Sequence, residues 1–307
     1  MPARFGTAAL VFGSLSLLLH LEAAPTQSDG QHPVVHFRIR DNYKVLVPVS
    51  VNGLEPVNFL LDTGTKTTLI DERLGQRMDL KPIARMPLTT FTGTRIVPIC
   101  RLNGVSMGEA SAQGFEAGLV DVRRAFSFDS DVYGILGQDF LVQLNYLLDY
   151  RARRIVLERR GDPQQDLQGD RVPLELREFR DHVHCNPGPS GGRQLHFILD
   201  SGAPFTVVFD DSQVCSILQV ERGYGRSGFS SPDGSRSAEP GRISIFRIGS
   251  KFLGNLSVLL TPARENEHRW ENGLLPTSLF QAIYFNHQSG YVILNPRVAA
   301  AATRNHR

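Results

Sequence analysis

The chain has few cysteines: Cys100, Cys185 and Cys215 are the only three among 307 residues. Three thiols allow at most one internal disulfide, which excludes the class of small scaffolds held together by several disulfides. A Cys185–Cys215 bridge within the second half of the chain and three separate buried thiols remain equally good interpretations. The fold must therefore be stabilised mainly by a hydrophobic core.

A strong charge of one sign is also missing. The 33 basic and 31 acidic side chains leave a formal charge of +2, and no long block of one sign is present. The densest basic stretch, Arg151 to Arg160, includes the apolar residues Ile155 to Leu157, which is typical of a strand edge or turn. A nucleic acid is therefore not expected as a partner.

Long apolar runs are absent except near the N-terminus. There Arg4 precedes an apolar stretch from Ala8 to Leu21, and the small residues Ala23 and Ala24 precede Pro25. The stretch is short for a membrane span of about 20 residues, and the pattern is typical of a signal peptide. We expect a signal peptide at residues 1–24 and a secreted or periplasmic protein, with an uncleaved N-terminal membrane anchor as the alternative.

The most informative feature is an internal similarity between the two halves. The segment Phe59–Gly64 (FLLDTG) recurs as Phe197–Gly202 (FILDSG), and Gly134–Gly137 (GILG) recurs as Gly273–Pro276 (GLLP). The interval from the aspartate to the second motif is 72 residues in one half and 73 in the other. Kept spacing of this kind predicts two units of similar structure.

Long segments of helical periodicity are nearly absent, and the apolar runs are short and bounded by turn residues. Residues 145–149 and 155–157 form such a pair of runs, and residues 282–286 and 292–294 form another, so both predict antiparallel hairpins. Short helices are expected near residues 71–78, 138–144, 210–218 and 277–283. We predict an N-terminal lobe at 34–158, a polar linker at 159–171, a C-terminal lobe at 172–296 and a tail at 297–307.

Each repeated motif places an aspartate, Asp62 or Asp200, directly after an apolar strand and before a turn with Gly64 or Gly202. A carboxylate in such a place is costly to bury alone. Two carboxylates that meet across a pseudo-twofold axis can share one proton and hold one water between them. That pair can act as a general acid and a general base.

These residues resemble the active-site signatures of the aspartic peptidases, and the compact lobes look closest to the retropepsin-like branch, doubled in one chain. Ile135-Leu136-Gly137 resembles the element that packs behind the aspartate loop in that family. The resemblance covers roughly residues 40–296. It implies a mainly β, bilobal acid-protease fold, with two homologous β-barrel-like lobes about a pseudo-twofold axis and short helices.

The resemblance also implies the roles of individual residues. Asp62 and Asp200 would be catalytic, and the supporting residues of their loops would be Thr63, Gly64, Thr65, Ser201, Gly202 and Ala203. Thr63 and Ser201 would hydrogen-bond across to the opposite lobe, with local turn bonding as the alternative. Because Thr65 has a hydroxyl and Ala203 has none, we expect Thr65 to favour the ionised form of Asp62 and to leave the shared proton on Asp200.

The activity implied is that of an aspartic endopeptidase, in which a water activated between the two aspartates attacks the peptide bond. The partner would be a polypeptide substrate, bound extended in the cleft between the lobes. No cofactor or metal is needed for this chemistry, and a monomer suffices because one chain carries both aspartates. The alternatives are a non-catalytic peptide-binding module of the same fold in the cell envelope and a structural protein whose aspartates only cap turns.

The resemblance also implies a covering hairpin, or flap, for which residues 88–95 have the strand-Gly-strand pattern. Phe91, Thr92, Gly93 and Thr94 would then lie near the substrate. A second mobile loop is expected at residues 228–241. Pro276 departs from the family pattern, which has glycine there, so the second lobe is expected to pack differently.

Two other motifs are set aside. Residues 223–228 fit a dinucleotide-binding glycine pattern, but no helix is expected after them. His182, His184 and Cys185 have metal-ligating side chains, yet we interpret them as exposed loop residues because no second pair accompanies them.

Overall fold

A computed structural model describes residues 32–89, 94–126, 131–158, 167–178, 180–185, 193–231, 234–262 and 270–298. The expected signal peptide lies outside these ranges. The described residues belong to one compact unit. Within the described ranges, none of the helices has both the length and the apolar character needed to cross a membrane.

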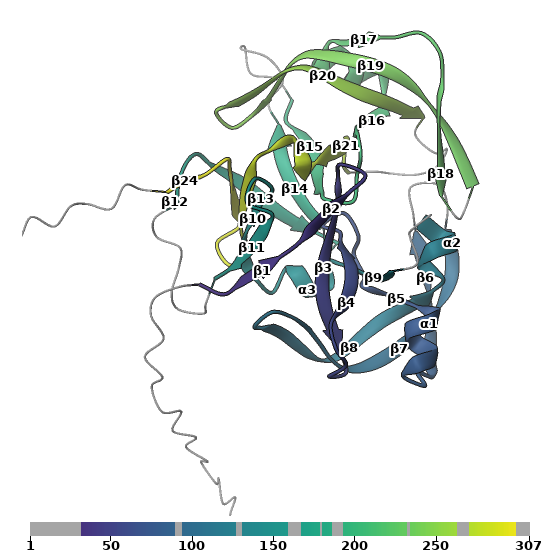
Figure 1. The fold of residues 1–307 in the computed structure, drawn as a ribbon. Coiled ribbons are helices and arrows are strands. Elements are labelled where there is room, and N and C mark those ends of the chain that lie inside the picture. The colour runs from purple at the N-terminus through teal and green to yellow at the C-terminus, as the bar shows by residue number, and fades with distance from the viewer. Residues whose placement is uncertain are drawn as a thin grey trace, which may run out of the picture. The chain divides into compact units, whose positions relative to one another are not determined.

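The fold is mainly β, as predicted (Figure 1). Most strands of the first half form one sheet, in the order β2 (Arg38–Arg40), β3 (Lys44–Val51), β4 (Val57–Leu61), β9 (Val132–Leu136), β5 (Leu69–Asp71), β8 (Ala110–Val120), β7 (Thr94–Met107) and β6 (Pro82–Thr89). Strand β3 explains why this sequence forms a sheet. Its β-branched residues Val45, Val47, Val49 and Val51 alternate along the strand, so all four side chains are buried on one face.

A second sheet contains the remaining long strands. Its order is β1 (Val34–His36), β11 (Arg154–Leu157), β10 (Asn145–Asp149), β22 (Ala282–Asn286), β23 (Tyr291–Leu294), β13 (Arg171–Arg177), β14 (Arg180–Cys185), β15 (Leu195–Asp200), β21 (Gly273–Pro276), β16 (Thr206–Asp210), β20 (Lys251–Pro262), β19 (Gly234–Ile248) and β17 (Val220–Arg222), with β18 (Ser227–Ser231) paired to β19. Strands β12 (Leu167–Gln168) and β24 (Arg297–Val298) pair with each other. The last residues of the predicted linker and the first residues of the predicted tail are therefore strand residues.

The strands around the two aspartates follow the same pattern in both halves. In the first half β4 runs parallel to β9, β9 is antiparallel to β5, and β5 is parallel to β8. In the second half β15, β21, β16 and β20 repeat these relations in the same order. Each half therefore places its aspartate at the end of a strand supported by a parallel neighbour.

The two halves are joined by their terminal hairpins, which lie side by side in Figure 1. Hairpin β10–β11 and hairpin β22–β23 are the pairs predicted from the sequence, and β10 pairs with β22 antiparallel, with Leu147 opposite Tyr284. Beneath this junction, the rings of Tyr146 and Phe285 stack with centroids 4.9 Å apart. Apolar residues of both halves therefore form one continuous core.

The helices are short, as expected. Helix α1 (Glu72–Arg77), α3 (Gln138–Leu141), α4 (Ser212–Leu218) and the 3-10 turn η1 (Thr277–Leu279) lie at the four predicted places. Asp71 and Asp211 cap α1 and α4 by accepting hydrogen bonds from backbone N–H groups. Helix α2 (Val122–Phe126) was not predicted, because its five residues are too few to show helical periodicity. The cysteines Cys100, Cys185 and Cys215 are free thiols.

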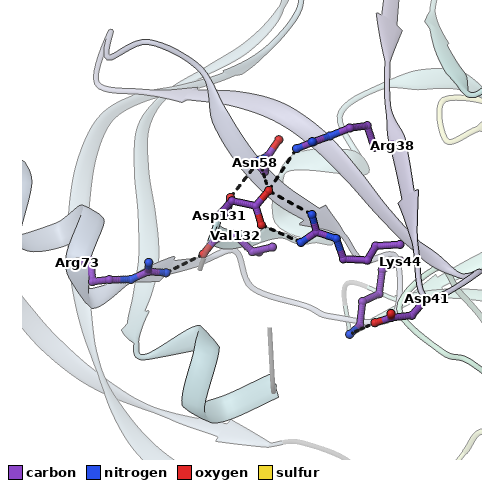
Figure 2. A network of polar contacts seen from close by, with 8 residues as sticks. Arg38, Asp41, Lys44, Asn58, Arg73, Asp131 and Val132 are labelled. Atoms are coloured by element: carbon purple, nitrogen blue, oxygen red, sulfur yellow. Dashed lines mark hydrogen bonds and ion pairs between the residues drawn. The ribbon is translucent and has the colours of Figure 1, made fainter. Parts of the chain in front are cut away.

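A polar network around Asp131 fixes the start of β9 (Figure 2). The Asp131 carboxylate accepts from Arg40 at 2.7 Å, and Asn58 of β4 donates to its carbonyl oxygen at 3.0 Å. Arg73 donates to the carbonyl of the next residue, Val132, at 2.9 Å. The hydrogen bond from Arg40 lowers the pKa of Asp131. This network holds β9 beside β4, the strand that leads to Asp62.

Candidate active site

The two repeated aspartates lie where buried strands end. Asp62 directly follows β4, and its N–H donates to the Leu136 carbonyl of the parallel strand β9 at 3.0 Å. Asp200 is the last residue of β15, opposite Pro276 of β21. Both residues are half-buried, so water can reach them while the surrounding protein removes part of their hydration.

The two carboxyl groups lie close together, each beside the glycine of the opposite loop, and each shifts the pKa of the other. Each also accepts from its own loop, at 2.9 Å from the N–H of Gly64 and at 2.8 Å from the N–H of Gly202. The glycines are needed because a Cβ on Gly64 would lie 2.4 Å from Cγ of Asp200, and one on Gly202 would lie 2.7 Å from Oδ2 of Asp62. Each loop therefore leaves space for the carboxyl group of the other half.

Thr63 and Ser201 lock the two loops together, and both side chains are buried. The Thr63 hydroxyl donates to the Leu199 carbonyl at 2.7 Å and accepts from the N–H of Ser201 at 3.0 Å. Reciprocally, the Ser201 hydroxyl donates to the Leu61 carbonyl at 2.7 Å and accepts from the N–H of Thr63 at 3.0 Å. The bonds run between the halves, as the cross-lobe prediction requires, and they fix how far apart the two aspartates lie.

The electrostatics of the pair are asymmetric. Burial, followed by the charge of Asp62, raises the pKa of Asp200 to about 8. Burial also raises the pKa of Asp62, but hydrogen bonds from Thr65 and Gly64 oppose that rise. The Thr65 hydroxyl donates to Oδ2 of Asp62 at 2.7 Å, as predicted, and Ala203 offers no counterpart. The proton shared by the pair is therefore favoured on Asp200.

Sequence reasoning missed a second layer behind Asp62. The Thr68 hydroxyl donates to Oδ1 of Asp139 at 2.7 Å and accepts from the N–H of Gly137 at 3.0 Å. Burial raises the pKa of Asp139 to about 6. The repeat itself held the signal, because Thr68 follows Asp62 by six residues and Thr206 follows Asp200 by the same interval.

The second half lacks this layer. Pro276 occupies the place of Gly137 and has no N–H to donate, and Ser278 stands where the first half has Asp139. The buried Thr206 hydroxyl consequently has no hydrogen-bond partner among the described residues. Pro276 adopts an extended conformation with φ −59° and ψ 129° and precedes the 3-10 turn η1 instead of an α-helix. The second half therefore lacks the hydrogen bonds that link Thr68 to Gly137 and Asp139 in the first half, and this is how its packing differs.

The flap prediction is only partly within the described residues. Thr94 begins β7 and pairs with Thr89 of β6, and their hydroxyl oxygens are 3.1 Å apart. Phe91, Thr92 and Gly93 lie outside the described ranges. In the second half, a mobile loop was predicted at residues 228–241, whereas the structure has the paired strands β18 and β19 there.

The glycine pattern and the histidine–cysteine group of the second half both lie in or beside strands. The glycine pattern of residues 223–228 runs into strand β18, which begins at Ser227, so the helix of a dinucleotide site is absent there. The interpretation of His182, His184 and Cys185 as exposed loop residues is wrong. All three lie in β14, where the alternation of the strand sends Cys185 to the opposite face from the two histidines, and His182 and Cys185 are buried.

Residues 47–140 match the model of a family described as aspartyl protease. The matched span includes Asp62, Thr65, Thr68 and Gly137, whereas Asp200 and the rest of the second half lie beyond it. No curated protein matches the chain. This segment of the first half is therefore similar to an aspartyl protease family.

Proposed function

We propose that this chain is an aspartic endopeptidase in which Asp62 and Asp200 activate a water molecule to hydrolyse peptide bonds. The observation that carries the proposal is the meeting of two carboxyl groups from the two halves, one of which has its pKa raised to about 8. A pair in which one member is ionised and the other protonated supplies a base and an acid at the same time. The hydrogen bond from Thr65 to Asp62, and the absence of a hydroxyl at Ala203, support Asp62 as the base.

The reaction follows from these proton positions. Ionised Asp62 removes a proton from the water as the water oxygen attacks the peptide carbonyl carbon, and Asp200 donates its proton to the carbonyl oxygen. The tetrahedral diol then collapses: Asp62 returns a proton to the leaving nitrogen, Asp200 recovers the proton of one diol hydroxyl, and the C–N bond breaks. Both aspartates end in their starting states, and no covalent intermediate forms.

The proposal extends to the setting of the reaction. A monomer suffices because both aspartates are in one chain, and the substrate would be a polypeptide bound in an extended conformation between the N-terminal lobe at 34–158 and the C-terminal lobe at 172–296. Arg4 and the apolar stretch that follows support a signal peptide and a secreted or periplasmic location.

The test is cleavage of an unbiased peptide library between pH 3 and pH 8 by the wild type and by Asp62→Asn and Asp200→Asn. We expect either substitution to reduce cleavage by about 10³-fold or more, since each removes one partner of the acid–base pair. Asp79→Asn is the matched control, because Asp79 is an exposed turn residue with φ +50°. Cleavage that survives in both active-site variants, or a folded wild type that binds peptides without cutting them at any pH, would contradict the proposal.

A further inference from the structure

Three side chains with metal-ligating atoms gather on one face of the β13–β14–β15 meander. His184 of β14 lies directly opposite His196 of β15, and their ring centroids are 4.7 Å apart. Glu175 of β13 is diagonal to His184, and its Oε2 lies 3.2 Å from Nε2 of that ring. One ligand atom from each of the three lies within 4.8 Å of the other two.

We propose that Glu175, His184 and His196 form a binding site for a late first-row divalent cation such as Zn²⁺. Two imidazoles and one carboxylate are a donor set that zinc and its neighbours in the series bind readily. The site is separate from the aspartate pair, and the proposed peptidase chemistry makes no use of it.

The geometry is close to that of a bound state. Metal–ligand bonds of 2.0–2.2 Å in a tetrahedron place the ligand atoms about 3.3–3.5 Å apart, so the three atoms must close by at most about 1.5 Å. All three residues are partly exposed, which leaves their side chains room to rotate and gives the ion a path from solvent. Three protein ligands also leave a fourth position for water.

His196 supports the assignment independently. Its ring nitrogen Nδ1 is buried and has no hydrogen-bond partner among the described residues. Such an atom calls for a partner that the described residues do not supply, and a cation is one kind of partner that an imidazole nitrogen takes. The Trp270 ring, with its centroid 3.9 Å from that of His196, and the Asn272 side chain, which accepts from the His196 N–H at 2.9 Å, hold this residue in position.

Two neighbours define the limits of the site. Arg177 donates to Oε1 of Glu175 at 3.1 Å, which orients the carboxylate and leaves Oε2 toward His184, but its positive charge opposes a bound cation. His182 lies beside Trp270, with ring centroids 4.7 Å apart, and its Nδ1 faces the Arg180 carbonyl at 2.9 Å. Its Nε2 is buried without a partner among the described residues, but His182 is not one of the three residues whose ligand atoms lie within 4.8 Å of one another, so it is a neighbour of the site.

A bound ion would link three strands of the second half. His196 lies on β15 four residues before Asp200, so the ion would tie the strand that carries this aspartate to β13 and β14. Because the unfolded chain does not hold the three ligands together, binding to the folded state raises the temperature of unfolding.

The chain contains its own reporter, since Trp270 is the single tryptophan and packs on His196. Chelator-treated protein is titrated with Cu²⁺ while tryptophan fluorescence is recorded, and Zn²⁺ is then added as a competitor. We expect saturable quenching at one Cu²⁺ per chain, with half-saturation at micromolar concentration or below, and recovery of the signal on addition of Zn²⁺. Equilibrium dialysis with Zn²⁺ and the Zn²⁺-dependent shift in unfolding temperature are the readouts that do not depend on Trp270.

The variants separate the proposed ligands from their surroundings. His184→Asn, His196→Asn and Glu175→Gln should each weaken Zn²⁺ retention by at least about 10-fold, whereas the matched control His182→Asn should retain it. Arg177→Gln should strengthen retention, because it removes the opposing charge. Failure of the folded wild type to retain Zn²⁺ at 100-fold excess over protein, or retention that is unchanged in His184→Asn and His196→Asn, would overturn the proposal. Peptide cleavage is not a readout here, so this outcome is independent of the proposed function.

Discussion

The two halves of the molecule place their aspartates by the same strand pattern but support them differently. Asp62 has a hydroxyl partner in Thr65 and a second layer of Thr68, Gly137 and Asp139 behind it. Asp200 has neither, since Ala203 carries no hydroxyl and Pro276 carries no N–H. The difference shows how a near-symmetric pair acquires unequal proton affinities: the better-bonded loop favours the charged carboxylate, and the poorer one favours the protonated carboxyl group.

The largest expected effect comes from substituting the loop glycine that both halves share. Gly64→Ala and Gly202→Ala should each lower kcat/KM for a library-derived peptide by about 100-fold or more, because the new Cβ displaces the opposite carboxyl group. The loss should be greater at Gly64, whose Cβ would lie 2.4 Å from Cγ of Asp200, compared with 2.7 Å from Oδ2 of Asp62 at Gly202. Gly254→Ala, where the nearest atom would be 4.0 Å away, serves as the control. Full activity in either active-site variant would show that the loops can separate without cost.

The next effect tests the second layer. Thr68→Val removes a hydroxyl that serves both Asp139 and Gly137, so we expect the free energy of unfolding to fall by about 2 kcal/mol. Thr206→Val removes a buried hydroxyl without a partner among the described residues, so stability should stay constant or rise by about 1 kcal/mol. Urea unfolding of both variants at pH 7 measures the contrast. Equal losses would mean that the second half satisfies Thr206 by another route.

A smaller effect concerns the proton itself. Thr65→Ala removes a bond that favours ionised Asp62, so the acid limb of the activity profile should move to higher pH by about one unit. Ala203→Ser would place a hydroxyl beside Asp200 and should move the alkaline limb to lower pH. Profiles of kcat/KM against pH for the three proteins decide this, and an acid limb that does not move in Thr65→Ala would refute the assigned roles.

The smallest effect distinguishes two contacts that bridge the halves. Tyr150 and Thr277 share a neutral hydrogen bond of 2.6 Å, while the His287 ring faces the Leu144 carbonyl at 2.7 Å and the Asp181 carboxylate at 2.9 Å. Burial lowers the pKa of His287, but the charge of Asp181 and the two hydrogen bonds together raise it more, so the net pKa is above the ordinary value. The contribution of His287 to stability is therefore complete below about pH 6.5 and lost as pH rises through its folded pKa.

Urea unfolding at pH 5.5 and pH 9 tests this contrast. His287→Gln should lose more stability at pH 5.5 than at pH 9, whereas Tyr150→Phe should lose the same amount, about 1 kcal/mol, at both. Equal losses at the two pH values for His287→Gln would show that this ring is not charged in the folded protein.

Much of the fold could be predicted because its signals are local. The hairpins at residues 145–157 and 282–294 show short apolar runs around turn residues, and helices α1 and α4 begin after the capping residues Asp71 and Asp211. Helix α2 escaped prediction because five residues are too few to show a period. Pairing between β10 and β22 joins residues that are 133 to 141 positions apart, so only the similarity of the two halves indicated it.

The sequence by itself determined which residues face each other at the site, because the repeated motifs around Asp62 and Asp200 give both halves the same strand pattern. It also showed that the two halves differ at one matched position, with Thr65 in the first and Ala203 in the second. The tertiary structure alone decided what those differences do. Whether the hydroxyl of Thr68 or Thr206 forms a hydrogen bond depends on a partner some 70 residues further along the chain. Likewise, the pairing of β13, β14 and β15 brings Glu175, His184 and His196 to one face of the sheet. Hydrogen bonding and ligand geometry act over a few ångströms in space, and distance along the chain does not report that distance.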